Sequence, residues 1–283
     1  MQGVWAGFTT LLDRAPEKFN MILEPGDLGY QELPGIAVLV GGMWIANLSY
    51  WGFNQYIIQR ALGAESEKEA QKGLAFAAFL KLLIPVIVVI PGIAALWLAQ
   101  NNVLPMDELS ATPDKTYGTL MTMVPSGLRG IVFAALIAAI VSSLASMMNS
   151  IATIFTMDIY RDYIVKNASE RHYVRVGRIT AFVAMLIALI LARPFLGGLE
   201  SAFQAIQEYT GFIAPGIVAV FLLGFFWKRA NKYGAFALLL SSAILSVIAK
   251  IILPDLPFVL RIWIVFLICI LVGVVTSLLS PAP

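Results

Sequence analysis

The sequence has little charge and almost no side chains of the kind that bind metals or form disulfides. Of its 283 residues, 13% are charged, one is a cysteine and one is a histidine, whereas about a quarter of a soluble domain is charged. The single cysteine, Cys269, excludes an internal disulfide, and with the single histidine it excludes a Cys/His metal cluster. The net charge of +2 does not indicate a nucleic-acid partner.

Long apolar runs take up most of the chain, which is 59% hydrophobic. A helix needs about 20 apolar residues to cross a bilayer. Seven segments approach this length, at roughly 35–58, 73–99, 129–159, 179–197, 204–226, 234–252 and 257–280. We therefore expect an all-α polytopic membrane protein of about seven transmembrane helices in a lipid bilayer. The sequence contains no HExxH motif and no carboxylate pair at mid-membrane, so we do not expect an enzyme.

Basic residues are distributed unevenly between the two sides of these spans. If the N-terminus lies outside, eleven of them fall in cytoplasmic loops: Arg60, Lys68, Lys72, Arg161, Lys166, Arg171, Arg175, Arg178, Lys228, Arg229 and Lys232. Seven fall outside, so the positive-inside rule predicts an outer N-terminus and a C-terminus inside. The first 33 residues lack the pattern of a signal peptide, and we expect the chain to be the interior of a longer protein.

The first expected span carries many hydrogen-bonding groups, in "GGMWIANLSYWGFNQYIIQR". Each such group left unpaired in hydrocarbon costs several kcal/mol, so these groups must have partners. The spacing of Asn47, Tyr50 and Asn54 would place them on one face of a continuous helix. This face is either a surface that packs on other helices or part of a broken helix that binds a neutral polyhydroxy solute.

Two other spans carry polar groups near the expected middle of the membrane. Lys81 stands about nine residues into the second span. It either binds a solute hydroxyl or carboxylate inside the bundle or extends its ammonium group to the membrane surface. In the fifth span, Gln207 precedes an expected helix interruption at "TGFIAPG". Gln207 is either a solute ligand or part of a polar cap on the span. Glu208 could be a structural partner for a nearby cation and is left unassigned.

The third span has a polar stripe of oxygen-bearing side chains at helical spacing in "ALIAAIVSSLASMMNSIATIF", formed by Ser142, Ser146, Asn149 and Thr153. Small residues allow close packing of helices. Adjacent hydroxyls and a freed carbonyl one turn earlier are also the neutral oxygen ligands that a hard cation such as sodium prefers. Both interpretations stay open at this point.

Four stretches together resemble the sodium/solute symporter family, and in particular its sodium/glucose and sodium/galactose branch. They are "WIANLSYWGFNQYIIQRALGA", "KGLAFAAFLKLLIPVIVVIPG", "FAALIAAIVSSLASMMNSIATIFTMDIY" and "AFQAIQEYTGFIAPGIVAVFLLGFFWKR". The resemblance implies a LeuT-like transporter core of two inverted five-helix repeats with discontinuous helices, and a discontinuous first span in this chain. This chain resembles the second repeat, so we expect it to need the N-terminal half that supplies the first.

The resemblance also implies roles for individual residues. Asn47, Lys81 and Gln207 resemble sugar-binding residues, Tyr50 resembles the aromatic inner gate on the sugar ring, and Asn54 resembles the residue that positions this tyrosine. Ser142 and Ser143, with the Ala139 carbonyl, resemble half of a site for the coupling ion, Na⁺.

We therefore expect sodium-coupled symport of a galactose- or glucose-like sugar across the bacterial cytoplasmic membrane by alternating access. We expect the chain to divide into an extracellular connector (1–34), a transporter core (35–230) and two accessory helices (231–283). The alternatives are a sodium symporter for another neutral solute, such as inositol or an amino acid, and a membrane sensor that binds the solute without moving it.

Overall fold

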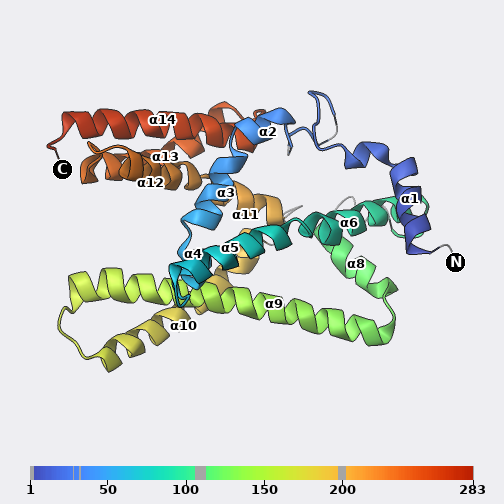
Figure 1. The fold of residues 1–283 in the computed structure, drawn as a ribbon, viewed down its shortest axis with the longest axis horizontal. Helices are drawn as coiled ribbons and strands as arrows, with labels where there is room; N and C mark the ends of the chain where they lie inside the picture. The colour runs from blue at the N-terminus through green and yellow to red at the C-terminus, as the bar shows by residue number, and fades with distance from the viewer. Residues whose placement is uncertain (1–2, 28, 32, 106–112, 197–201, 283) are drawn as a thin grey trace. The chain divides into compact units, whose positions relative to one another are not determined.

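The computed structural model (Figure 1) describes residues 3–282 apart from residues 28, 32, 106–112 and 197–201. Most of the described residues are helical, and none lies in a strand. They form two compact units: unit 1 is Met1–Asn54 with Phe203–Pro283, and unit 2 is Gln55–Ala202.

Unit 1 combines the two ends of the chain. Its helices are α1 (Val4–Arg14), the 3₁₀ helix η1 (Pro16–Phe19), α2 (Ile36–Val40), α3 (Met43–Gly52), α11 (Ala202–Gly211), α12 (Ala214–Phe226), α13 (Lys232–Ile252) and α14 (Phe258–Leu279). Unit 2 contains α4 (Gln55–Leu62), α5 (Glu67–Lys81), α6 (Ile84–Gln100), the 3₁₀ helix η2 (Pro113–Lys115), α8 (Thr116–Met123), α9 (Ser126–Thr153), the π-helix η3 (Ile154–Ile164) and α10 (Glu170–Leu196).

Within the described part of the chain, six helical segments are long and apolar enough to cross a membrane. They are Glu67–Gln100, Ser126–Ile164, Glu170–Phe195, Ala205–Phe226, Lys232–Ile252 and Phe258–Leu279. Six of the seven expected spans are thereby confirmed in length and composition. The expected first span consists of three short helices, α2, α3 and α4, so the prediction that it is discontinuous is also confirmed.

Two further helix breaks follow from proline. Proline has no N–H, and its ring clashes with the carbonyl four residues earlier, which interrupts a helix at that point. Lys81, the last residue of α5, stands four residues before Pro85, and Gly211, the last residue of α11, stands four residues before Pro215. Pro91 lies inside α6 without ending it.

Unit 1 has its core where α3, α12, α13 and α14 meet. The buried cluster consists of Ile45, Val218, Ala219, Leu238, Ile262, Val265, Phe266 and Cys269. Trp44 of α3 packs edge-on against Trp263 and Phe266 of α14, and Phe53 stacks on Phe221 of α12 with 4.2 Å between ring centroids. These aromatic contacts fasten the short helix α3, which has too few residues to be stable alone.

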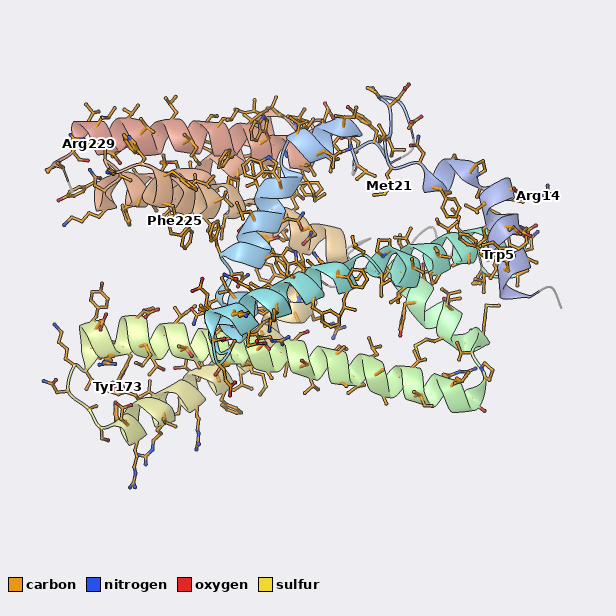
Figure 2. All side chains as sticks on the ribbon, in the orientation of Figure 1. Trp5, Arg14, Met21, Tyr173, Phe225 and Arg229 are labelled. Carbon is orange, nitrogen blue, oxygen red and sulfur yellow. The ribbon has the colours of Figure 1, made fainter. Side chains whose placement is uncertain are left out.

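Unit 2 pairs the long segment α9–η3 with α10. Tyr173, near the start of α10 (Figure 2), is buried and fastens the connection between the two. Its hydroxyl donates to the carbonyl of Val165 at 2.8 Å and accepts from the N–H of Ala168 at 3.2 Å. The spanning windows of α9 and α10 have no buried residues within the described structure, so both helices leave apolar surface for lipid or other helices.

Candidate functional site

Asn47 and Tyr50 lie one turn apart on α3 and are both exposed. Asn47 donates one amide N–H to the carbonyl of Met43 at 2.9 Å. An amide group has a second N–H and an acceptor oxygen, so this bond uses only part of its capacity. The Tyr50 ring, 39% exposed, lies edge-on to Trp51 with 5.0 Å between ring centroids.

Asn54 does not share a helix with Asn47 and Tyr50. Helix α3 ends at Gly52, and Asn54 lies in the short connection before α4. The three residues would share one face only on a continuous helix, so the break after Gly52 separates Asn54 from the other two. Phe53 leaves the helical conformation, with φ −121° and ψ 0°, and its ring stacks on Phe221 of α12.

Gln207 is exposed on α11, one turn before the break at Phe212–Ile213. The predicted interruption after Gln207 is confirmed. The N–H groups of Phe212 and Ile213 bond to the carbonyls of Tyr209 and Thr210, three residues back, so the chain tightens before α12 begins.

Two serines of α13 satisfy the polar groups that this break exposes. The hydroxyls of Ser242 and Ser246 both donate to the carbonyl of Phe212, at 3.0 and 3.1 Å. The Ser242 oxygen also accepts from the N–H of Gly216 at 3.0 Å. Each of these groups would otherwise be unpaired in an apolar region, at a cost of several kcal/mol.

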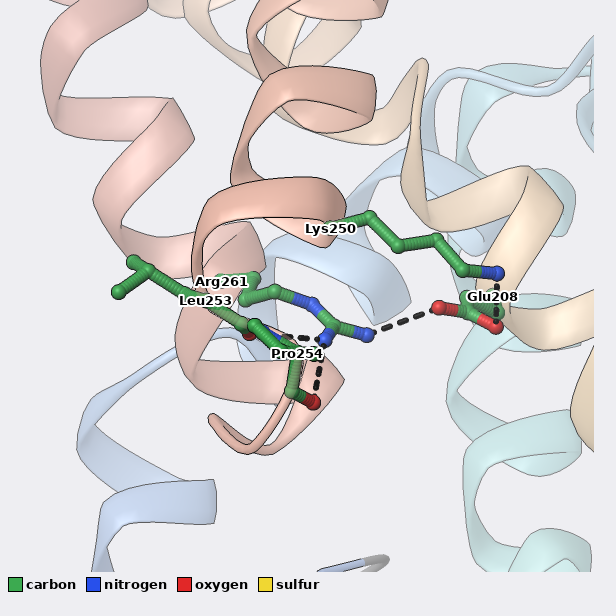
Figure 3. A network of polar contacts seen from close by, with 5 residues as sticks. All are labelled: Glu208, Lys250, Leu253, Pro254 and Arg261. Atoms are coloured by element: carbon green, nitrogen blue, oxygen red, sulfur yellow. Dashed lines mark hydrogen bonds and ion pairs between the residues drawn. The ribbon is translucent and has the colours of Figure 1, made fainter.

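Glu208 lies at the centre of an ion-pair network at the adjoining ends of α13 and α14 (Figure 3). It accepts from Arg261 Nη2 at 2.8 Å and from Lys250 Nζ at 3.0 Å. Arg261 also donates through Nη1 to the carbonyls of Leu253 and Pro254, each at 3.2 Å. We call Glu208, Lys250 and Arg261 the Glu208 cluster.

Lys81 belongs to unit 2 and is the last residue of α5, immediately before the break that precedes Pro85. It is exposed within the unit. A cation at the C-terminal end of a helix is favoured by the carbonyl groups that end there. Lys81 and Gln207 both lie near the end of a helix that a proline interrupts. Lys81 is the last residue of α5, and Gln207 lies four residues before the last residue of α11.

Ala139, Ser142 and Ser143 all lie on α9, and all three are exposed within unit 2. One turn further along, Ser146 donates its hydroxyl to the carbonyl of Ser142 at 3.0 Å. No group of three or more His, Cys, Asp or Glu residues that could hold a metal ion occurs in the residues described. The hydroxyl and carbonyl oxygens of α9 are neutral, which suits a weakly bound monovalent cation better than a transition metal.

The rest of the α9 polar stripe packs against α4. Gln59 donates to the carbonyl of Ser146 at 3.2 Å and accepts from Asn149 at 3.1 Å. Arg60 donates to the Ser146 hydroxyl at 2.6 Å. In this part of the stripe the helix-packing interpretation is therefore confirmed, whereas Ser142 and Ser143 remain exposed.

Comparison with known proteins decides the family. Residues 9–241 match the sodium:solute symporter family. The chain belongs to this family. It is therefore a multi-pass membrane protein of a family of transporters, not of enzymes, as expected.

Individual relatives are named for sugar and inositol cotransport. The chain is 50% identical to a sodium/glucose cotransporter of Vibrio parahaemolyticus, over 98% of this chain and 52% of that protein. It is 35% identical to the sodium/myo-inositol cotransporter 2 of mouse, over 78% of this chain and 34% of that protein, with a similar match to the human protein. The chain spans about half the length of the Vibrio protein and about a third of the length of the mouse and human proteins.

The residues that support the span-five break were not found from the sequence. Ser242 and Ser246 are spaced i, i+4 on α13, and Arg261 stands in the first turn of α14. The spacing of these two serines in an otherwise apolar helix was the sequence feature that could have indicated their role at the break. The signal for the Glu208 cluster was the presence of two cations beside the loop at 253–257 and one carboxylate in α11.

Proposed function

We propose that this symporter chain is the second-half portion of a transporter that moves a glucose- or galactose-like sugar together with Na⁺ across the bacterial cytoplasmic membrane. The observation that carries the proposal is the 50% identity with a sodium/glucose cotransporter over 98% of the chain. The positions of the polar groups on interrupted helices support it, because broken membrane helices offer backbone and side-chain groups to solutes.

The proposed sugar ligands are Asn47, Lys81 and Gln207, with Tyr50 as the aromatic gate and Asn54 as its positioning residue. Amides both donate and accept, and an ammonium donates, so these groups match the mixed donor and acceptor character of sugar hydroxyls. A tyrosine ring offers an apolar face to the sugar ring and a hydroxyl to its edge. The exposure of Asn47, Tyr50 and Gln207 in unit 1 is consistent with this role.

The proposed sodium ligands are the Ala139 carbonyl and the hydroxyls of Ser142 and Ser143. They are hard, neutral oxygen donors within about one turn of α9, which fits Na⁺ and leaves it weakly enough bound to dissociate. The remaining ligands would come from the first half of the transporter.

The fold that we propose is a LeuT-like core of inverted repeats, of which residues 35–230 form the second. Residues 1–34 would be an extracellular connector and 231–283 two accessory helices, with the C-terminus inside. The partner this requires is an N-terminal half, which the relatives' greater length supports.

Alternating access then couples the two solutes. Sodium stabilises an outward-open state, the sugar completes its site, and both leave inward when Tyr50 moves aside. One charge crossing about 100 mV releases about 2.3 kcal/mol, and a tenfold sodium gradient adds about 1.4 kcal/mol. Together these support accumulation of a sugar by roughly a few hundredfold.

Uptake by proteoliposomes tests the proposal. The complete transporter, with its N-terminal half, is reconstituted and given labelled glucose, galactose, myo-inositol or a neutral amino acid. We expect glucose or galactose to accumulate only under an inward sodium gradient, and not when potassium replaces sodium. Equal uptake in both salts would refute sodium coupling.

A second candidate function is sodium-coupled inositol transport, which the mouse and human relatives favour. Myo-inositol accumulation that exceeds glucose accumulation in the same vesicles would replace the sugar assignment with this one. Solute binding without accumulation of any solute would instead support a membrane sensor.

A further inference from the structure

We propose that Glu208 is a positioning residue for Gln207, and that the Glu208 cluster holds the half-helix α11 in place on α13 and α14. The part of this proposal that concerns sugar rests on the function proposed above. The part that concerns α11 does not, because it follows from the contacts of the cluster alone.

Helix α11 needs such a fastening because its backbone is poorly connected to the helix that follows it. Pro215 cannot supply the N–H that would continue α11 into α12. The last bonds of the break run to carbonyls three residues back, at 3.2 and 3.3 Å. A ten-residue helix is marginal without tertiary contacts, so its orientation depends on side chains outside it.

The Glu208 cluster supplies these contacts from two helices at once. Arg261 of α14 and Lys250 of α13 bind different oxygens of the same carboxylate, at 2.8 and 3.0 Å. Arg261 is also fixed by the carbonyls of Leu253 and Pro254 at the end of α13. One guanidinium therefore joins α11, the α13–α14 connection and α14, which a lysine with its single point charge would do less rigidly.

The two cations differ in how strongly they hold Glu208. The Arg261 side chain is 13% exposed and the Glu208 side chain 26%, whereas Lys250 is 45% exposed. Water screens the Lys250 pair more, and pairs of that kind contribute little. Removing Glu208 would leave the mostly buried guanidinium of Arg261 without its carboxylate partner. This costs more stability than the loss of the Lys250 pair.

Lys250 makes additional contacts on the same side of α11. Its Nζ lies 5.9 Å from the ring centroid of Tyr209 and 5.8 Å from that of Phe212. These cation–π distances place the ammonium over the last turn of α11 and the first residue of the break. The lysine thus resists rotation of α11 about its axis.

The end of α11 approaches α14 at Gly211. A methyl group on Gly211 would lie 2.9 Å from Cδ1 of Ile262. A cavity of about 10 Å³, room for about one water, lies between Glu208, Phe212, Ser246 and Arg261. Because Gln207 precedes Glu208 directly in α11, any turn of the helix that displaces the carboxylate also redirects the Gln207 amide.

Hydrogen exchange in the complete transporter tests the fastening without reference to transport. We compare the native protein with Glu208→Gln, which keeps the shape of the side chain and removes its charge. We expect exchange in α11 to rise at least tenfold in the variant, with α12 and α14 unchanged. A milder variant, Lys250→Gln, should raise it less, in keeping with the greater exposure of Lys250.

The matched control is Glu69→Gln. Glu69 pairs with Lys72 at 2.7 Å on α5, where both side chains are more than half exposed. An exposed pair of this kind contributes about 0–1 kcal/mol, so its loss should leave exchange and uptake unchanged. If α11 exchanges at the native rate in both Glu208→Gln and Arg261→Gln, the fastening is refuted.

Sugar kinetics test the positioning of Gln207. In Glu208→Gln we expect the KM for sugar to rise about tenfold, while Vmax and the sodium concentration for half-maximal uptake stay within twofold. If exchange in α11 is faster but the KM is native, Glu208 does not position Gln207. The claim that the Glu208 cluster holds α11 would still stand. If the native transporter moves no sugar with sodium, the proposed function fails, and the exchange result still decides whether Glu208 holds α11.

Discussion

The hydroxyl of Ser242 donates a hydrogen bond of 3.0 Å to the backbone carbonyl of Phe212, across the break between α11 and α12. The same oxygen accepts from the N–H of Gly216, so one side chain of α13 bonds to both sides of the interruption. A proline break inside a membrane needs such partners, because hydrocarbon offers none to a freed carbonyl or N–H.

Replacing Ser242 with alanine should destabilise unit 1. The variant leaves the N–H of Gly216 without its bond, while Phe212 keeps its bond from Ser246. We expect a loss of about 1–3 kcal/mol, measured as a lower Tm in detergent. Ser241→Ala is the control, since Ser241 bonds only to Ala237 of its own helix in the described structure; an equal loss there would contradict the role of Ser242.

A larger side chain at Gly216 should force α12 and α13 apart. A methyl group there would lie 2.6 Å from the Cβ of Ser242, closer than any real packing contact. Gly216→Val should therefore cost about 1–3 kcal/mol through overpacking, again read from the Tm. Gly224→Ala, on the same helix with nothing within 4 Å of the added methyl, should leave the Tm unchanged or raise it.

Removing the hydroxyls of Ser142 and Ser143 on α9 should abolish sodium dependence. In the complete transporter, Ser142→Ala with Ser143→Ala takes away two of the proposed neutral oxygen ligands. We expect sodium-driven uptake to fall at least a hundredfold. The control is Ser146→Ala, one turn away and bonded to Arg60, which should retain sodium activation. Unchanged sodium dependence in the double variant would refute the assignment of Ser142 and Ser143 as sodium ligands.

The solute should protect position 81 from labelling. A Lys81→Cys variant, in a background with Cys269→Ala, is treated with a small thiol reagent in the presence of sodium. We expect the transported sugar to slow labelling at least fivefold and a non-transported sugar to have no effect. Equal rates with and without sugar would show that Lys81 does not line the sugar site.

Local features of the sequence predicted six membrane spans and the interruption before Pro215 in span five. The apolar runs alone located six spans to within a few residues, except at the start of the second and fourth, where α5 and α10 begin earlier in polar segments. The breaks at Lys81 and Gly211 follow from Pro85 and Pro215, which act only on the turn before them. The conformation of Asn54 could not be predicted, because contacts of Phe53 with a distant helix end α3.

The α9 stripe shows the limit of pattern reasoning at a site. Ser142, Ser146 and Asn149 have the helical spacing that the sequence predicts, yet they differ in environment. Ser146 and Asn149 are bound by Gln59 and Arg60 of α4, whereas Ser142 is exposed. Spacing identifies a face, but only the neighbouring helix shows which part of the face is occupied.

The amino-acid order was enough to establish a helical membrane protein, its symporter resemblance and the positions of its interrupted helices, because apolar length, glycine and proline act over a few residues. It did not reveal that Glu208 binds Lys250 and Arg261, 42 and 53 residues away, or that Ser242 satisfies the break in span five. Those contacts exist only once α11, α13 and α14 are packed together, since each depends on which faces of separate helices meet.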